Sequence, residues 1–143
     1  MTTPDNYRYH TSVTIRYADL DRMGHVNNAK YLTYVEQARV CYFRDVGFWD
    51  GIRSDNGVIV AKTVVEYKLP LGINDSTVDV WTRCSRLGNK SFDIQSVINR
   101  SADGLTAATA LTVVVAYNYE NAQTIVIPEN WRKIILDYEP DLK

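Results

Sequence analysis

The first regular pattern in the chain is a short alternation of hydrophobic and polar residues. It runs from about residue 11 to residue 17, and side chains two residues apart share the same character. A period of two is typical of a half-buried β-strand. We therefore expect a first strand here, after a loosely packed N-terminal arm of residues 1–10. One face of this strand would carry Val13, Ile15 and Tyr17, and the other would carry Thr14 and Arg16.

The pattern becomes helical between residue 28 and about residue 46. Hydrophobic side chains recur there at spacings of four, three, four and four, which places them on one face of an α-helix. The pair Asn27 and Asn28 precedes this face, and asparagine is favoured at a helix start because its side chain accepts a bond from a free backbone N–H. Gly47 offers a stop, since glycine readily adopts the left-handed conformation that closes a helix. The apolar face would consist of Tyr31, Val35, Ala38, Tyr42 and Val46.

After residue 57 the chain has the pattern of an antiparallel sheet. Four long segments of strand-forming residues are separated by short stretches with the glycine, proline, asparagine and aspartate residues that favour turns. Short links between long strands predict a meander. Residues 107–117 are apolar or small on both faces, as in a strand covered from both sides. Residues 125–127 fit either a last short strand or an extended segment. The four segments are residues 57–69, 75–87, 91–101 and 105–119.

This order of elements predicts an α+β fold in which a curved antiparallel sheet of about five strands wraps one long helix. Without a second helix to form a bundle, a single apolar helix is buried only if a twisted sheet encloses it. At 143 residues the chain fits one domain. We expect that domain to cover residues 1–143, with residues 129–143 as a C-terminal tail. The outer face and edges of such a sheet would tend to be covered by a second copy of the chain.

Composition and charge restrict the function classes. Hydrophobic residues make up 45% and charged residues 23% of the chain, which is ordinary for a folded soluble protein. The longest apolar run is too short to span a bilayer, and we expect no membrane partner. A net charge of −1 argues against nucleic acid as a main partner. The first ten residues lack a secretory signal, so we expect a cytoplasmic protein unless a leader has been removed. Cys41 and Cys84 are then expected to be reduced.

The candidate chemistry lies just before the predicted helix. Asp21 is in a loop that passes through Gly24 and His25 to the helix start. Free backbone N–H groups at a helix start can polarise a carbonyl oxygen, and a carboxylate beside them can attack the carbonyl or deprotonate a water. This combination suits acyl transfer. Aspartate is also an ordinary loop residue, so from the residues alone a structural role for Asp21 stays open.

Other polar residues nearby have structural explanations. Asp19 fits a loop or cap position. His25 either orients the carboxylate or a water, or is simply hydrogen bonded. Glu36 and Arg39 are three residues apart on the helix and can form a surface ion pair. The spacing of Asp19, Asp21 and His25 matches no metal-ligand pattern, so we expect no metal.

The run of residues 17–39, YADLDRMGHVNNAKYLTYVEQAR, resembles the signature of hotdog-fold acyl thioesterases. The resemblance is to the 4-hydroxybenzoyl-CoA thioesterase group and its bacterial acyl-CoA thioesterase relatives, and HVNN-x-KY is also similar to plant acyl-ACP thioesterases. A weaker similarity covers residues 11–128, through the turn at Pro70 and the GNKSF segment at residues 88–92. The resemblance implies a long helix enclosed by a curved antiparallel sheet. It also implies a homodimer or homotetramer with its sites at the dimer interface.

The resemblance implies catalytic roles for residues at the helix entry. Asp21 would be the nucleophile or general base, and the backbone N–H of Asn28 would polarise the thioester carbonyl. His25 is a secondary candidate by our own weighing of the residues, and the resemblance assigns it no role. Met23 stands where plant-type enzymes carry an asparagine, so their more elaborate residue network is not implied here.

The resemblance also implies a coenzyme A site. Lys90, with Ser91 beside it, matches a position where a relative binds coenzyme A phosphates. Arg86 joins them by our own inference from the local charge. No cofactor is implied, because coenzyme A is part of the substrate.

The predicted function is hydrolysis of an acyl-CoA thioester to a free acid and coenzyme A. Hydrolysis of an acyl-ACP and a non-catalytic hotdog module that binds acyl-CoA are the alternatives. A hotdog dehydratase would need a paired histidine and carboxylate across the interface, and His25 is not in the helix-side context that this requires. Other relatives carry a bulky aromatic residue at the position of Asn27 or Asn28, so the acyl chain is not predicted.

Overall fold

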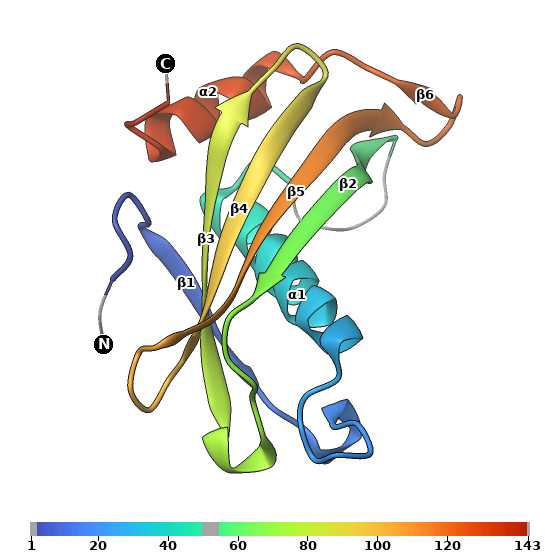
Figure 1. Ribbon diagram of the computed structural model, residues 1–143. Coiled ribbons are helices and arrows are strands. Elements are labelled where there is room, and N and C mark those ends of the chain that lie inside the picture. The colour runs from blue at the N-terminus through green and yellow to red at the C-terminus, as the bar shows by residue number, and fades with distance from the viewer. Residues whose placement is uncertain (1–2, 50–54, 143) are drawn as a thin grey trace.

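The computed structural model describes residues 3–49 and 55–142 of the chain. An antiparallel sheet of five long strands curves around the helix α1, and a short strand and a second helix complete this part of the chain (Figure 1). The predicted α+β architecture is confirmed. The strands are β1 (Tyr9–Thr14), β2 (Asn56–Tyr67), β3 (Thr77–Leu87), β4 (Ser91–Arg100), β5 (Thr106–Asn118) and β6 (Gln123–Thr124); the helices are α1 (Asn28–Val46) and α2 (Glu129–Tyr138), with 3-10 turns η1 (Tyr17–Asp19) and η2 (Ile73–Asp75).

The strand order is β1-β3-β4-β5-β2, with the two-residue β6 paired to β5. The predicted meander is correct for β3, β4 and β5, which follow one another through short turns. It is wrong for β2, which pairs antiparallel with β5 at the far edge of the sheet. Periodicity reports which face of a strand is buried, whereas strand order depends on contacts between distant segments. β1 and β2 are therefore the two edge strands (Figure 1).

The helix α1 follows its sequence signals. The Asn27 side chain accepts a hydrogen bond from the Ala29 N–H (2.9 Å), and Gly47 closes the helix in the left-handed conformation with φ of 100°. Both predicted ends are confirmed. The predicted apolar face packs against the sheet and contributes to two core clusters, one around Val35 and the other around Tyr42. Helix and sheet thus bury each other's apolar faces.

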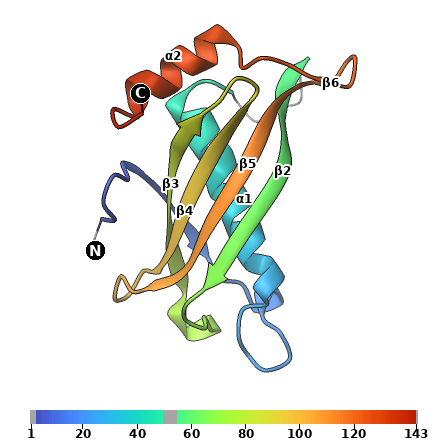
Figure 2. The same ribbon diagram turned by 45° about the horizontal axis from the view of Figure 1, so that its top comes forward.

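The helix α2 is a difference from the predicted C-terminal tail. Trp131 and Ile135 are buried in the core cluster around Tyr42, and α2 crosses the end of the sheet at the β3–β4 turn (Figure 2). A sequence signal for this helix exists, because Pro128 starts the segment and Trp131, Ile135 and Tyr138 recur at helical spacing. None of the helices in the described residues is long and apolar enough to cross a membrane.

The first strand starts and ends earlier than predicted. β1 ends at Thr14, and the chain leaves the sheet after the buried Ile15. Tyr17 therefore lies in η1, is 84% exposed, and does not share the buried face that the alternation predicts. The end of the N-terminal arm is fixed and not loose, because the Tyr9 hydroxyl donates to the Asp45 carboxylate at the end of α1 (2.6 Å).

Candidate active site

Asp21 lies in a tight loop of residues 20–26, here called the Asp21 loop, which joins η1 to α1 at one end of the sheet (Figure 1). Two main-chain hydrogen bonds close it. The Asp21 N–H donates to the His25 carbonyl (2.7 Å), and the Gly24 N–H donates to the Asp21 carbonyl (3.1 Å). Gly24 has φ of 84°, which glycine adopts without steric cost. The predicted bend is confirmed, and the loop has a fixed internal shape.

The Asp21 carboxylate has one engaged and one free oxygen. Oδ1 accepts hydrogen bonds from the Met23 N–H (2.8 Å) and the His25 N–H (3.3 Å). Oδ2 has no hydrogen-bond donor among residues 3–49 and 55–142, and the residue is half-buried. The loop backbone therefore fixes the rotamer through one oxygen and leaves the other available to a substrate or a water.

The start of α1 supplies free hydrogen-bond donors directly after the loop. The Asn27 side chain and carbonyl take up the N–H groups of Ala29 (2.9 Å) and Lys30 (2.8 Å). The Asn28 N–H has no acceptor within the described part of the chain. The Tyr67 hydroxyl donates to the Asn28 carbonyl (3.1 Å) and ties the helix start to the end of β2. An exposed N–H at the positive end of a 19-residue helix is suited to polarise a carbonyl oxygen.

Asp19 has the structural role that its position predicts. It is 1% exposed, and its carboxylate accepts from the Tyr34 hydroxyl (2.7 Å) and from the N–H and guanidinium of Arg16 (both 3.0 Å). Burial pushes the pKa of Asp19 upward, but the hydrogen bonds from Arg16 and Tyr34 outweigh burial and hold that pKa below its ordinary value. The Asp19 carbonyl also accepts the Asn27 N–H (2.8 Å), so this buried aspartate helps to fix the helix start.

His25 contributes to the site through its backbone. Its N–H and carbonyl both bond Asp21, and the residue forms a β-bridge with Gly72. The imidazole is on an exposed residue. The structure thus gives His25 a role in shaping the loop, whereas a role for its ring in the reaction stays a prediction.

The described residues support neither a cysteine nucleophile nor a metal cluster. Burial raises the pKa of Cys84 to about 12, which disfavours the thiolate that a cysteine nucleophile requires. Cys41 and Cys84 are both free thiols in the structure. No group of three or more His, Cys, Asp or Glu side chains that could hold a metal occurs in the residues that the structure describes.

The predicted coenzyme A residues lie at the other end of the sheet. Lys90 and Ser91 adjoin the β3–β4 turn, whereas the Asp21 loop adjoins the β2–β3 connection (Figure 1). The 11 residues of β3 separate these ends by about 35 Å. The exposed Lys90 ammonium lies 3.5 Å from the Thr124 hydroxyl. One copy of the chain therefore does not bring Lys90 to Asp21.

Other cations at the β3–β4 turn are already engaged. The Arg86 guanidinium donates to the Asp93 carboxylate (2.8 Å) and to the Ser91 hydroxyl (2.9 Å). Arg132, which the sequence analysis does not identify, donates to the Gly88 carbonyl (2.7 Å). It lies on α2, so its place beside this turn follows only once that helix is known. Arg86 and Arg132 thus both hold the shape of this turn through hydrogen bonds.

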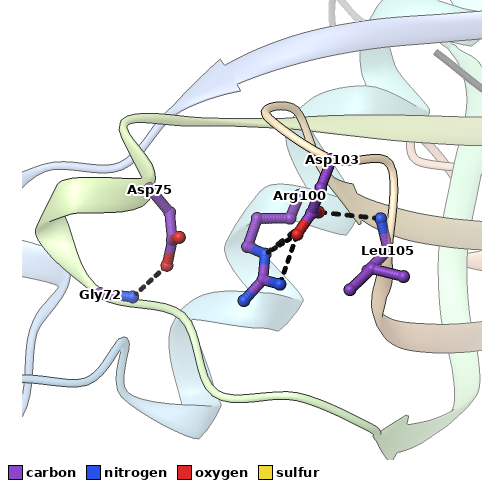
Figure 3. A network of polar contacts seen from close by, with 5 residues as sticks. All are labelled: Gly72, Asp75, Arg100, Asp103 and Leu105. Atoms are coloured by element: carbon purple, nitrogen blue, oxygen red, sulfur yellow. Dashed lines mark hydrogen bonds and ion pairs between the residues drawn. The ribbon is translucent and has the colours of Figure 1, made fainter.

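The Asp21 loop also has a support that its own stretch of sequence does not predict. The Val26 N–H donates to the Leu71 carbonyl in the β2–β3 connection (2.7 Å). The next residue, Gly72, donates its N–H to Asp75 Oδ2 (2.7 Å; Figure 3). The turn chemistry of residues 70–75 is readable from the sequence. Its contact with the Asp21 loop is not, because the two segments are far apart in the chain.

Comparisons with known proteins identify the family of the chain. Residues 15–135 match the family model of the thioesterase-like superfamily. The long-chain acyl-CoA thioesterase FadM of Escherichia coli K12 is 24% identical over 133 residues, which cover 86% of this chain and 93% of FadM.

Solved structures give the same result. A thioesterase from Thermus thermophilus, crystallised with coenzyme A and Zn, is 32% identical and has a TM-score of 0.81, over 96% of this chain and 98% of that one. The PA5185 protein of Pseudomonas aeruginosa PAO1 has a TM-score of 0.85 at 21% identity, over 97% and 96% of the two chains, and supports the fold alone. The family model covers most of the length of this chain. The chain therefore belongs to the thioesterase-like superfamily and is a thioesterase of the hotdog fold.

Proposed function

We propose that the chain hydrolyses an acyl-CoA thioester to a free acid and coenzyme A. One observation carries this proposal. Within the described chain, Asp21 Oδ2 has no donor and the Asn28 N–H has no acceptor, and the two groups lie on consecutive segments. The substrate class is supported by relatives, since one is named a long-chain acyl-CoA thioesterase and another was crystallised with coenzyme A.

The two groups would act on the same carbonyl, one on its oxygen and the other at its carbon. The Asn28 N–H would donate to the thioester carbonyl oxygen and stabilise the charge that develops there, a contribution of about 3 kcal/mol. As a general base, Asp21 would take a proton from a water that attacks the carbonyl carbon, and the tetrahedral intermediate would expel the coenzyme A thiolate. As a nucleophile, Asp21 would attack the carbon itself, expel the same thiolate and leave an anhydride that water cleaves.

A second copy of the chain would cover the edge strand β2. This strand exposes apolar side chains, with Ile59 at 37%, Val60 at 49% and Val64 at 44% exposure. An exposed apolar edge is a template for pairing with another strand. Antiparallel pairing of two β2 strands about a two-fold axis gives a homodimer, and two such dimers give a homotetramer.

This pairing would also complete the coenzyme A site. It turns the partner subunit end for end, so the β3–β4 turn of the partner comes to the end of the sheet that carries Asp21. The partner subunit's Lys90, with Ser91 and Arg86 of the same turn, would then bind the coenzyme A phosphates. Asp21 would act on the thioester at the other end of the ligand.

The test is an acyl-CoA hydrolysis panel with straight-chain and aromatic acyl groups, measured as release of the free thiol. Asp21→Asn keeps the side-chain shape but removes the base or nucleophile, so kcat should fall by about 10²–10⁴-fold. Asp137→Asn, at an exposed position on α2, is the matched control and should keep the wild-type rate.

Three outcomes would contradict the proposal. Undiminished turnover by Asp21→Asn would remove Asp21 from the mechanism. Tight acyl-CoA binding with no hydrolysis by the wild type would indicate a binding module. Turnover of acyl carrier protein thioesters alone would change the substrate class.

A further inference from the structure

The Asp21 loop rests on two residues of the β2–β3 connection. The Val26 N–H donates to the Leu71 carbonyl (2.7 Å), and His25 is bridged to Gly72. The Val26 side chain is also buried in the core, and the Asp19 carbonyl accepts the Asn27 N–H at the end of the loop (2.8 Å). The backbone at residues 71 and 72 therefore supplies the main-chain contacts between the loop and the β2–β3 connection.

That backbone is held in turn by one carboxylate. Asp75 Oδ2 accepts the Gly72 N–H (2.7 Å), and the Asp75 N–H donates back to the Gly72 carbonyl (3.1 Å; Figure 3). The next residue, Ser76, has φ of 64° and ψ of −60°, a conformation that L-residues rarely adopt. Such a conformation persists only where the surrounding contacts hold it. The reciprocal bonds between Gly72 and Asp75 supply contacts of this kind.

A cation from a third segment lies near the same turn (Figure 3). Arg100, at the end of β4, pairs with Asp103 in the β4–β5 turn (2.6 Å), and its guanidinium lies between Asp103 and the Gly72–Asp75 turn (Figure 3). The hydrogen bond from Arg100 to Asp103 is the main reason that the pKa of Arg100 is raised, and the charge of Asp75 adds to it. Asp75 thus lies where the β2–β3 and β4–β5 connections meet. Gly72 is the residue that lies between Asp75 and the Asp21 loop.

We infer that Asp75 is a positioning residue for the thioesterase reaction, which holds the Asp21 loop in register through Gly72. The expected effect on kcat rests on the proposed function, whereas the expected effect on the loop does not. Asp75 bonds the turn that the loop is docked on and has no hydrogen bond to Asp21 or Asn28. Its loss should move the attacking oxygen relative to the helix start without removing a group that binds substrate.

The kinetic consequence differs from that of a lost binding contact. A displacement of about 1 Å in a reacting group can cost about a hundredfold in rate. We therefore expect Asp75→Ala to lower kcat by about tenfold to a hundredfold, while KM changes by less than about threefold. Asp75→Asn keeps an oxygen that accepts the Gly72 N–H, so it should recover most of kcat. A purely structural residue would lower stability in Asp75→Ala without this separation of kcat from KM.

The experiment combines kinetics with amide hydrogen exchange of wild type, Asp75→Ala and Asp75→Asn. Exchange reports the loop directly, because the Asp21 and Val26 N–H groups are both bonded in the folded chain. These two amides should exchange at least about tenfold faster in Asp75→Ala and at nearly the wild-type rate in Asp75→Asn. Asp45→Ala is the matched control, since it removes a carboxylate that accepts a 2.6 Å bond from Tyr9 at the opposite end of α1. It should change neither the two amides nor kcat.

Each result has a distinct meaning. Unchanged exchange at Asp21 and Val26 in Asp75→Ala would overturn the inference, and so would an equal loss of kcat in Asp45→Ala or Asp75→Asn. If the wild type hydrolyses no thioester, the proposed function fails, while the exchange rates still decide whether Asp75 holds the loop.

Discussion

A site shared between two subunits should allow two defective variants to restore each other. Asp21→Asn removes the reacting carboxylate, and Lys90→Ala removes a cation proposed to bind coenzyme A phosphate at the far end of the sheet. In a dimer paired through β2, each site would take Asp21 from one subunit and Lys90 from the other. A mixed dimer of the two variants then has one site with both defects and one site with none.

The size of the effect follows from this arrangement. Asp21→Asn alone should lose about 10²–10⁴-fold in kcat. A charged hydrogen bond to phosphate contributes about 1.5–3 kcal/mol. Lys90 is exposed, so we take the lower end of that range and expect KM of Lys90→Ala to rise by about tenfold. The mixed dimer should show about half of the wild-type kcat with the wild-type KM, because one of its two sites is intact.

The assay needs two affinity tags and co-expression of the two variants. Purification on both tags isolates the mixed dimer, and its thiol release is measured over a range of acyl-CoA concentrations. A doubly tagged dimer of wild type and Asp21→Asn controls for the tags, and it should also give about half of the wild-type kcat.

A site built from a single subunit would give a different result for the mixed dimer. If one subunit supplied both Asp21 and Lys90 to a site, every site in the mixed dimer would carry one defect. Its activity would then equal the average of the two parent variants, with a raised KM. That result would refute the shared site and, with it, the antiparallel pairing of β2.

Two further predictions concern the edge strand and the C-terminal helix. Val64→Lys adds a charge to the exposed face of β2 and should give monomers by light scattering with a loss of turnover; a dimeric, active variant would exclude β2 as the interface. Glu139 is 4% exposed, its carboxylate accepts from Tyr42 (2.5 Å) and from the Cys84 N–H (2.9 Å), and burial raises its pKa above 4.5. The folded chain then binds this proton more tightly than the unfolded chain, so the free energy of unfolding falls as pH rises from about 4.5 through the raised pKa. In urea unfolding at several pH values, Glu139→Gln should flatten this fall. If the dependence of the unfolding free energy on pH is unchanged in the variant, another group causes it.

The parts of the fold that depend on local chemistry are predictable from the sequence. Asn27 and Gly47 mark both ends of α1, because capping involves residues within one turn of the helix. The four later strand segments also agree with β2 to β5 within a few residues. The place of β2 beside β5 was not predictable in this way, since pairing between distant strands leaves no mark on the period of either one. Tyr17 was misplaced because the alternation continues past Ile15, where the chain leaves the sheet.

The candidate site divides along the same line. Asp21 and Asn28 lie within one stretch of sequence, so loop and cap hydrogen bonds set most of their geometry, and both can be proposed as candidates before the fold is known. The support from Asp75 joins two connections that are distant in the chain. The proposed coenzyme A contacts depend on a contact between two chains. Changes at the helix entry or at Asp75 should therefore act mainly on kcat, whereas changes at the β3–β4 turn should act mainly on KM. Changes on the β2 edge should abolish turnover, because they separate the subunit that supplies Asp21 from the one that supplies Lys90.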